Sequence, residues 1–294
     1  MINIYPEKIP TKELHQYLVS SIGPRPIALA STVDKLGNNN VSPFSFFNIF
    51  SANPPIAIFS PARRVRDNTT KDTLENITQT KEVVINIVTK NLVEQASLSS
   101  LEYPSDVDEF IKAGLTTVKS NIVTPPRVKE SPIQMECIVN DIVSLGKDGG
   151  AGNLIICEIK LIHISKKILN AHNKIDPNKL KLVGRLGSNW YCDAFDNSLF
   201  EINNPTRNIG IGFDQIPNMI KKSNILTKNN LTRLASIKRL PSKEDINLFK
   251  QTNDIKSIIK RDNYKDKLHK KAQMYIHQDD VESAWKCLLI DKLN

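Results

Sequence analysis

The chain has 294 residues, of which 40% are apolar and 24% are charged, a balance typical of a globular protein with a buried core. It contains no apolar run long enough to cross a bilayer, so we expect no membrane span. Its first residues lack the basic and then apolar layout of a secretion signal, and we therefore expect a cytoplasmic protein.

The first half of the chain has the pattern of short strands separated by turns. Apolar and β-branched runs predict strands at residues 26–32, 41–50, 53–60, 82–88, 133–143 and 153–164. Pro54 and Pro55 can only open their strand or lie at a sheet edge, because proline donates no ladder hydrogen bond. The glycine-rich residues 146–152 suit a hairpin loop. A dinucleotide-binding fingerprint would need a helix after these glycines, whereas a strand-like run follows them. The pattern favours an antiparallel barrel.

Two helices are predicted between the strands. Asp72 and Glu75 have the spacing of a capping box with Asp72 as N-cap, and this helix would run to about Thr80. A second helix is expected to start near Ser105 and to end at Gly114.

The composition changes near residue 196. Asn- and Lys-rich segments there alternate with short amphipathic stretches at 214–222, 242–252, with Ser242 as N-cap, and 281–289. We therefore predict two domains, a barrel at 1–195 and a helical C-terminal extension at 196–294.

The net charge of +9 raises the question of a nucleic-acid partner. Residues 196–294 hold 18 Lys and Arg against 12 Asp and Glu, but these charges are mixed, as in residues 260–271, and do not gather with aromatic side chains. We favour a solvated surface and do not expect nucleic acid as a partner.

The four cysteines, Cys137, Cys157, Cys192 and Cys287, form no C-x-x-C pair, and no histidine lies at ligand spacing. We expect thiols without a disulfide role and no metal site.

Two segments could bind a ligand. Residues 68–73 place hydroxyls, Lys71 and the free N–H groups of a helix start together, a combination that suits a phosphate. The alternative is a simple helix cap. Residues 26–32 and 42–48 combine hydroxyls with three phenylalanines, which suits the edge and faces of a flat heteroaromatic ring. The alternative is that these phenylalanines fill the barrel core.

No catalytic residue can be named. The five histidines lack a nearby nucleophile with a recognisable elbow, and G-x-S-x-G does not occur, so the sequence gives no support to hydrolase chemistry.

Taken in order, these segments resemble the flavin reductase-like family of FMN-binding split barrels. The resemblance lies in residues 23–32, Gly37 and Asn40, 42–48, 53–55 and 71–77, with support at 82–86, 108–110, 113–115, 125–127, 136–137, 184–187 and Tyr191. It covers about residues 5–195.

The resemblance implies a six-stranded-type antiparallel split barrel, mainly β with some α, that pairs as a homodimer with FMN at the subunit interface. Carried over by position, the cofactor-binding residues fall into four groups. They are Ala30, Ser31 and Thr32 of the first strand, Ser45, Phe46, Phe47 and Asn48 near the ring and ribityl chain, Ser60, Lys71, Asp72 and Thr73 near the phosphate, and Arg185 from a later strand or the partner subunit.

The first hypothesis is an enzyme in which FMN takes a hydride from NADH or NADPH and passes electrons to free flavin, a partner redox protein or a small acceptor. Arg63, Arg64 and Arg66 would contact the phosphates of the dinucleotide. The second is a flavoredoxin-like electron carrier with no nicotinamide reaction of its own. The third is a binding module that uses the basic C-terminal extension to recruit an acidic protein or RNA.

Overall fold

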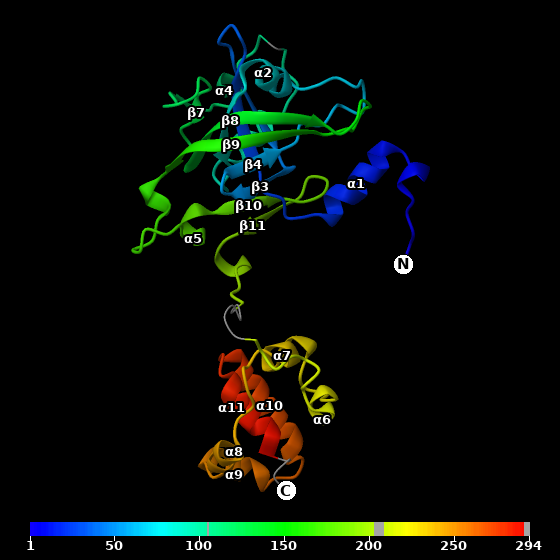
Figure 1. Ribbon diagram of the computed structural model, residues 1–294, viewed down its shortest axis with the longest axis vertical. Helices are drawn as coiled ribbons and strands as arrows, with labels where there is room; N and C mark the ends of the chain where they lie inside the picture. The colour runs from blue at the N-terminus through cyan, green and yellow to red at the C-terminus, as the bar shows by residue number, and fades with distance from the viewer. Residues whose placement is uncertain (105, 203–208, 291–294) are drawn as a thin grey trace. The chain divides into compact units, whose positions relative to one another are not determined.

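The computed structural model describes residues 1–104, 106–202 and 209–290, which fall into two compact units, Met1–Phe200 and Glu201–Asn294 (Figure 1). The first unit contains all the strands that the structure describes, and the second is built from helices. Within the described residues, no helix combines the length and the apolar character needed to cross a bilayer.

The first unit is organised around one antiparallel sheet with the strand order β2-β1-β5-β8-β9-β4-β3. Its strands are β1 (Ala28–Val33), β2 (Asn39–Phe44), β3 (Phe47–Ala52), β4 (Pro55–Phe59), β5 (Glu82–Ile87), β8 (Ile133–Ser144) and β9 (Asn153–Ile164). Two small hairpins accompany it, β6 (Thr117–Val118) with β7 (Arg127–Val128), and β10 (Leu182–Arg185) with β11 (Tyr191–Ala194).

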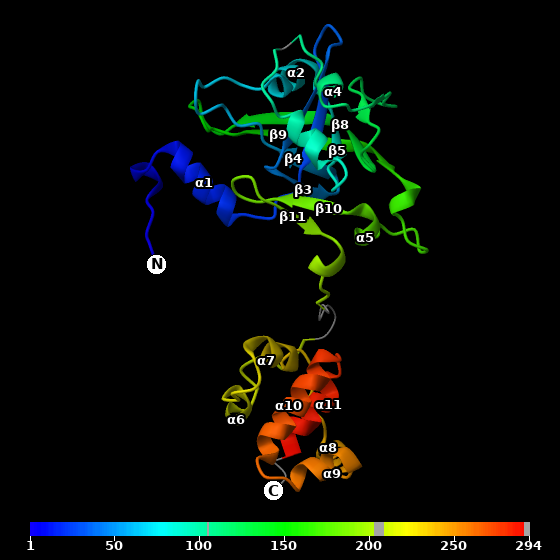
Figure 2. The same cartoon turned by 180° about the vertical axis from the view of Figure 1, so that it is seen from behind.

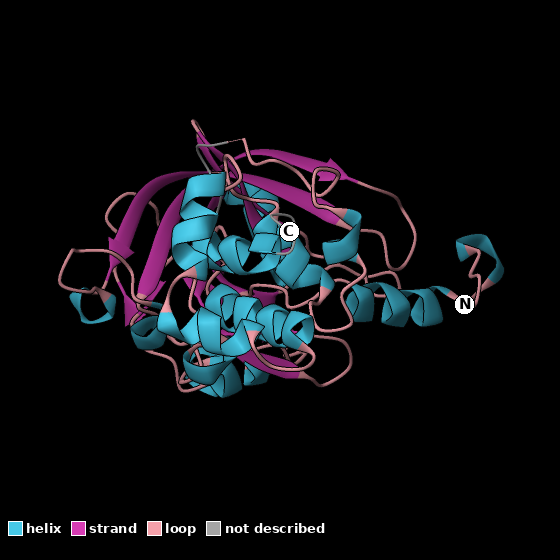
Figure 3. Cartoon of the chain, turned by 90° about the horizontal axis from the view of Figure 1, so that it is seen from below, coloured by secondary structure: helices cyan, strands magenta, loops and turns pink. Residues whose placement is uncertain are grey.

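The connection between β2 and β3 explains why this sheet forms a barrel. The two strands lie at opposite edges of the strand order, yet only Ser45 and Phe46 separate them in the chain. The sheet must therefore curl until its edges meet, and the curved strands are visible in Figure 3. Residues 39–52 act as one long bent strand that pairs with β1 through its first half and with β4 through its second. If β2 and β3 are counted as one strand, the seven-stranded sheet has six strands and matches the predicted six-stranded type of barrel.

The barrel interior is filled by small and β-branched side chains of the strands together with Phe44 and Phe59, whose ring centroids are 5.2 Å apart. Helix α2 (Asp72–Thr80) covers one end and contributes Leu74 and Ile77 to this core. A second cluster lies outside the barrel, where α3 (Val93–Leu98) and α4 (Glu109–Lys112) pack against β1 and β2.

Helix α1 (Thr11–Ser21) reaches away from the strands in all three views (Figures 1–3). Of its side chains only Val19 is buried. The remaining short helices of the first unit are η1 (Pro6–Lys8), η2 (Lys166–Ile168), α5 (Pro177–Leu180) and η3 (Asp196–Ser198).

The second unit contains α6 (Asn218–Lys221), α7 (Lys228–Leu234), α8 (Lys243–Lys250), α9 (Asn253–Ile259), α10 (Tyr264–His277) and α11 (Val281–Leu289). They enclose a separate apolar core centred on Trp285, which is fully buried and donates its indole N–H to the Leu234 carbonyl at 2.8 Å.

The structure confirms the strands predicted from sequence to within a few residues, except that the strand predicted at 41–50 is divided into β2 and β3 at Ser45 and Phe46. It also confirms the extent of α2. The predicted capping box at α2 is wrong, because Lys71 occupies the N-cap position and Asp72 is already helical. Glu75 accepts instead from the Thr70 hydroxyl at 2.8 Å. The helix predicted from Ser105 begins only at Glu109, and Ser105 itself lies outside the described residues. The N-cap at Ser242 is confirmed as part of a capping box with Asp245.

Candidate binding site along strand β2

Of the cavities along strand β2, the strand at one edge of the sheet order, three concern the site. We name them the central, arginine and lysine cavities. The central cavity, of about 450 Å³, lies between the end of β2, helix α3 and the β10–β11 hairpin. The arginine cavity, of about 340 Å³, shares Pro43, Ser45 and Arg185 with it. Both volumes fall in the range of ordinary ligand pockets. The lysine cavity, of about 20 Å³, lies farther back along β2 at Asn40 and Ser42.

Arg25 fixes the wall of the arginine cavity. Its guanidinium donates to the carbonyls of Val19 and Ile22 at the end of α1, to the Leu186 carbonyl at 3.0 Å and to the Ser45 hydroxyl at 3.3 Å. Burial and the charge of Arg185 lower the pKa of Arg25. This arginine is therefore largely committed to holding α1, the hairpin and Ser45 together.

Arg185 is the less committed of the two arginines. Its guanidinium donates to the Ser188 carbonyl at 2.6 Å and stacks over the Tyr191 ring at 4.4 Å. It lines both the central and the arginine cavity. Since a guanidinium carries five N–H donors, most of those of Arg185 remain available to an anionic or carbonyl group in either cavity.

The lysine cavity lies at the start of α2. Lys71 Nζ donates to the Ser42 hydroxyl at 2.8 Å and lies 5.5 Å from the centroid of the Phe44 ring. Burial, and then the charge of Arg64, lowers the pKa of Lys71. Thr73 is fully buried and donates to the Asn40 side-chain oxygen at 2.9 Å. A cation, a hydroxyl and the N-terminal end of a nine-residue helix thus meet at one point.

Comparison with known proteins identifies the family of this chain. The flavin reductase like domain model matches residues 20–176, more than half of the chain. The chain belongs to the flavin reductase-like family. An uncharacterized protein of Aquifex aeolicus is 37% identical over 62% of this chain and 90% of its own length.

Two solved structures support the flavin reductase-like assignment. Nitrilotriacetate monooxygenase component B of Bacillus cereus is 31% identical, with a TM-score of 0.63 over 69% of this chain and 98% of its own. A split-barrel protein of Shewanella frigidimarina, classed with the flavin reductases, is 26% identical, with a TM-score of 0.58 over 67% of this chain and 95% of its own. The second unit, Glu201–Asn294, lies outside the matched family domain.

Seven of the residues predicted to bind flavin line these cavities. Ser45 and Arg185 line the central and arginine cavities, Phe46 and Ser60 the arginine cavity, and Lys71, Asp72 and Thr73 the lysine cavity. The structure therefore brings together residues from four separate parts of the first unit along one strand. Their contact with flavin stays a prediction.

The other five predicted residues do not line the three cavities. Ala30 lies in the barrel core. The fully buried Ser31 hydroxyl donates to the Pro126 carbonyl, and that of Thr32 accepts from the Asn76 amide at 3.1 Å. Phe47 packs partly against the core, and the exposed Asn48 accepts from the Ile49 N–H at 2.8 Å.

The structure adds site residues that the sequence did not single out, among them Arg25, Ser42, Ser97, Ser100 and Glu109. Arg25, Ser42 and Glu109 lie inside segments that carry the family resemblance, and this resemblance was the signal that could have identified them. Ser97 and Ser100 come from α3 and the turn after it, a segment for which no element was predicted.

The arginines predicted to meet dinucleotide phosphates are held by residues of their own loop and by Glu102. Arg63 donates to Asn68, and Arg64 to Thr69, Thr70 and Glu102. Arg66 pairs with Asp67 and Glu102 at 2.9 and 2.8 Å. These contacts stabilise the loop before α2 and leave fewer donors for a ligand than Arg185 has.

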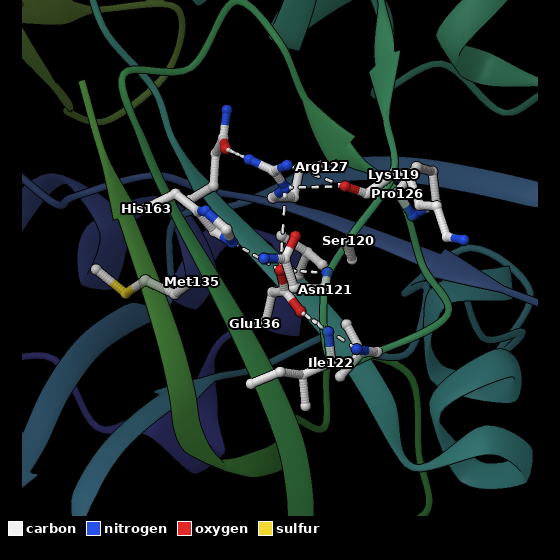
Figure 4. A network of polar contacts seen from close by, with 12 residues as sticks. Lys119, Ser120, Asn121, Ile122, Pro126, Arg127, Met135, Glu136 and His163 are labelled. Carbon is white, nitrogen blue, oxygen red and sulfur yellow. Dashed lines mark hydrogen bonds and ion pairs between the residues drawn. The ribbon is translucent and has the colours of Figure 1, made fainter.

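A second buried polar network lies away from the three cavities, on β8 (Figure 4). The fully buried Glu136 accepts from the backbone N–H groups of residues 121–123 at 2.9, 2.6 and 3.2 Å. It also contacts His163 Nε2 at 2.7 Å and lies 3.9 Å from the Arg127 guanidinium. Burial alone would raise the pKa of Glu136, but the hydrogen bonds from Asn121, His163 and Ile122 outweigh it and lower the pKa.

Proposed function

We propose that this protein is an FMN-dependent oxidoreductase that takes a hydride from NADH or NADPH and passes electrons to free flavin, a partner redox protein or a small acceptor. The observation that carries the proposal is the row of three cavities along β2, with Lys71 at one end and the Arg25–Arg185 pair at the other, in a domain of the flavin reductase-like family. FMN, when bound, supplies the redox chemistry by accepting a hydride at its own N5.

The residues present fit such a cofactor. A flat ring needs a cavity of several hundred Å³ with apolar walls and a few polar groups, and the central and arginine cavities offer Pro43, Phe46 and the Ser45 hydroxyl. An anionic tail needs a cation and short donors, which Lys71, Ser42 and the start of α2 provide. The chain's part is to bind, to orient and to leave one face of the ring open.

We also propose a homodimer, because apolar side chains are exposed on two neighbouring parts of the barrel. Ile49 and Phe50 are 47% and 65% exposed on β3, which among the described strands pairs with β4 alone. Leu18 and Ile22 are 54% and 66% exposed at the end of α1. A second copy would cover such a surface. Sedimentation should show a dimer that Phe50→Asp weakens, and a wild-type monomer at micromolar concentration would contradict it.

A flavoredoxin-like electron carrier is the second candidate. It is favoured by the loop contacts of Arg63, Arg64 and Arg66, which leave no dedicated phosphate cluster for a dinucleotide there. Anaerobic mixing of the FMN-loaded protein with NADH and NADPH distinguishes the two. Bleaching of the flavin absorbance within seconds supports the reductase, and no bleaching with either nucleotide supports the carrier.

The placement of the cofactor is tested with Lys71→Met. If Lys71 faces the phosphate, this variant should lower FMN affinity about tenfold or more, the scale of one charge-assisted hydrogen bond, and leave riboflavin affinity nearly unchanged. Lys90→Met, which removes a surface lysine paired with Asp193, is the matched control. Equal losses for FMN and riboflavin would show that the phosphate lies elsewhere.

A further inference from the structure

Glu109 differs from the other buried polar side chains of the described residues. Its Oε2 is the buried side-chain polar atom for which these residues provide no hydrogen-bond partner. The side chain is only 5% exposed, and its other oxygen, Oε1, accepts from the Asn40 amide at 3.0 Å. A buried acceptor without a donor is costly, so a missing partner is the first explanation to test.

The unpaired carboxyl belongs to the lysine cavity. Glu109 lines this cavity together with Ser42, Lys71 and Thr73. Lys71 Nζ donates to the Ser42 hydroxyl, which uses one of the three N–H donors of the ammonium group. Thr73 donates to Asn40 and so does not serve Glu109. Neither of these contacts reaches Glu109 Oε2, which remains an acceptor without a donor among the described residues.

The size and charge of the cavity decide which group would fit. The cavity volume of about 20 Å³ is enough for one water-sized group, because a cavity needs about 10–15 Å³ to hold a single water molecule. A hydroxyl fits inside this volume, whereas a whole phosphate or an aromatic ring does not, so a phosphate that meets Lys71 would lie outside the cavity. A hydroxyl also brings the O–H donor that a carboxylate oxygen requires, and an anion inside the cavity would be repelled by Glu109 and Asp72.

We propose that Glu109 is a ligand-binding residue whose Oε2 accepts a hydrogen bond from one hydroxyl of a polyol chain. This inference rests on the proposed function, in which the polyol is the ribityl chain of the flavin. Glu109 would then select flavins that carry a hydroxylated side chain, while Lys71 beside it meets the anionic tail.

The test compares two flavins that differ in this chain. Riboflavin carries the ribityl hydroxyls, whereas lumiflavin has a methyl group in their place. Their dissociation constants are measured by quenching of flavin fluorescence with the full-length protein and with its Glu109→Ala variant. The ratio of the two affinities is the readout, because a general disturbance of the site would weaken both flavins alike.

We expect Glu109→Ala to reduce the preference for riboflavin over lumiflavin about tenfold, the scale of a hydrogen bond to a charged group. Glu130→Ala, the same change at an exposed carboxylate that accepts from the Thr116 N–H, should leave the ratio unchanged. Glu109→Gln, which keeps the side-chain shape, should give a smaller reduction because a hydroxyl can also accept from its amide.

An unchanged ratio in Glu109→Ala would overturn the inference, since Oε2 would then be satisfied by water alone. Weak binding of both flavins by a folded Glu109→Ala variant, with the ratio kept, would likewise give Glu109 a structural role. If the wild-type protein binds neither flavin nor FMN, the proposed function fails and this inference fails with it.

Discussion

Two buried glutamates of the first unit have opposite environments. Glu136, on β8, accepts three backbone N–H groups and contacts His163 and Arg127. Glu109, on α4, has one oxygen bonded to Asn40 and the other without a protein partner. Burial raises the pKa of Glu109, whereas hydrogen bonds overcome burial and lower that of Glu136. A carboxylate whose bonds are all made within the chain serves the fold, whereas one left with a vacant acceptor beside a cavity is available to a ligand.

The largest expected effect is on stability, from Glu136→Ala. Removing this carboxylate leaves three backbone N–H donors without their acceptor and takes away the partner of the His163 ring, so we expect a loss of stability of about 3 kcal/mol or more. Hydrogen–deuterium exchange of β8 and β9 peptides in increasing urea measures it within the first unit.

The control for this change is Glu158→Ala on the neighbouring strand, where the carboxylate forms a surface ion pair with Lys160. Such pairs contribute about 1 kcal/mol or less. Similar losses for both variants would remove the distinction between the two glutamates.

A smaller loss of stability is expected from His163→Ala. The ring supplies one of the contacts of Glu136 and is itself mostly buried, so its removal should cost about 1–2 kcal/mol. The same exchange experiment reports it, with the exposed His172→Ala as the matched histidine change. If His163→Ala destabilised the strands as much as Glu136→Ala, the ring and not the backbone N–H groups would hold the carboxylate.

The sequence predicted the barrel better than the helices for a physical reason. Strands β5 and β9 are β-branched runs bounded by turn residues, a pattern that local propensity alone identifies. Helices α1 and α10 escaped prediction because few of their side chains are buried in an apolar core. Only Val19 of α1 is buried, and α10 is mostly polar with Leu268, Ala272 and Ile276 on its buried face.

Local sequence patterns also predicted only part of the site. Lys71 and Ser45 were predicted because their motifs resemble a family, and the structure places both at the cavities. The contact of Ser31 with the ligand stays a prediction, and its hydroxyl donates to Pro126, a residue 95 positions away in the chain. Glu109 was missed because its significance depends on Asn40, 69 positions away. Local sequence identifies a polar side chain, but only the fold decides which partner satisfies it.

The smallest effect, and the one that separates the two glutamates most directly, is the pH dependence of stability. Glu136 has a folded pKa below its ordinary value of 4.5, so its contribution is present above that pH and is lost as the pH falls through the lowered value. Glu109 has a folded pKa above 4.5, so its contribution is full below that pH and is lost as the pH rises through the raised value. Asp72 adds to the upward shift of Glu109, while Asn40 and the Val41 N–H oppose it.

Glu136→Gln should therefore remove part of the loss of stability that occurs as the pH falls below 4.5. Glu109→Gln should remove part of the loss of stability that occurs as the pH rises above 4.5. The measurement is the urea dependence of exchange in β8 peptides, repeated from acid to neutral pH for the wild type and both variants. Because the two pKa shifts have opposite signs, the two difference profiles should slope in opposite directions. Profiles that slope the same way would mean that both carboxylates are charged and fully paired in the folded protein, and Glu109 would then have no acceptor left to offer a ligand.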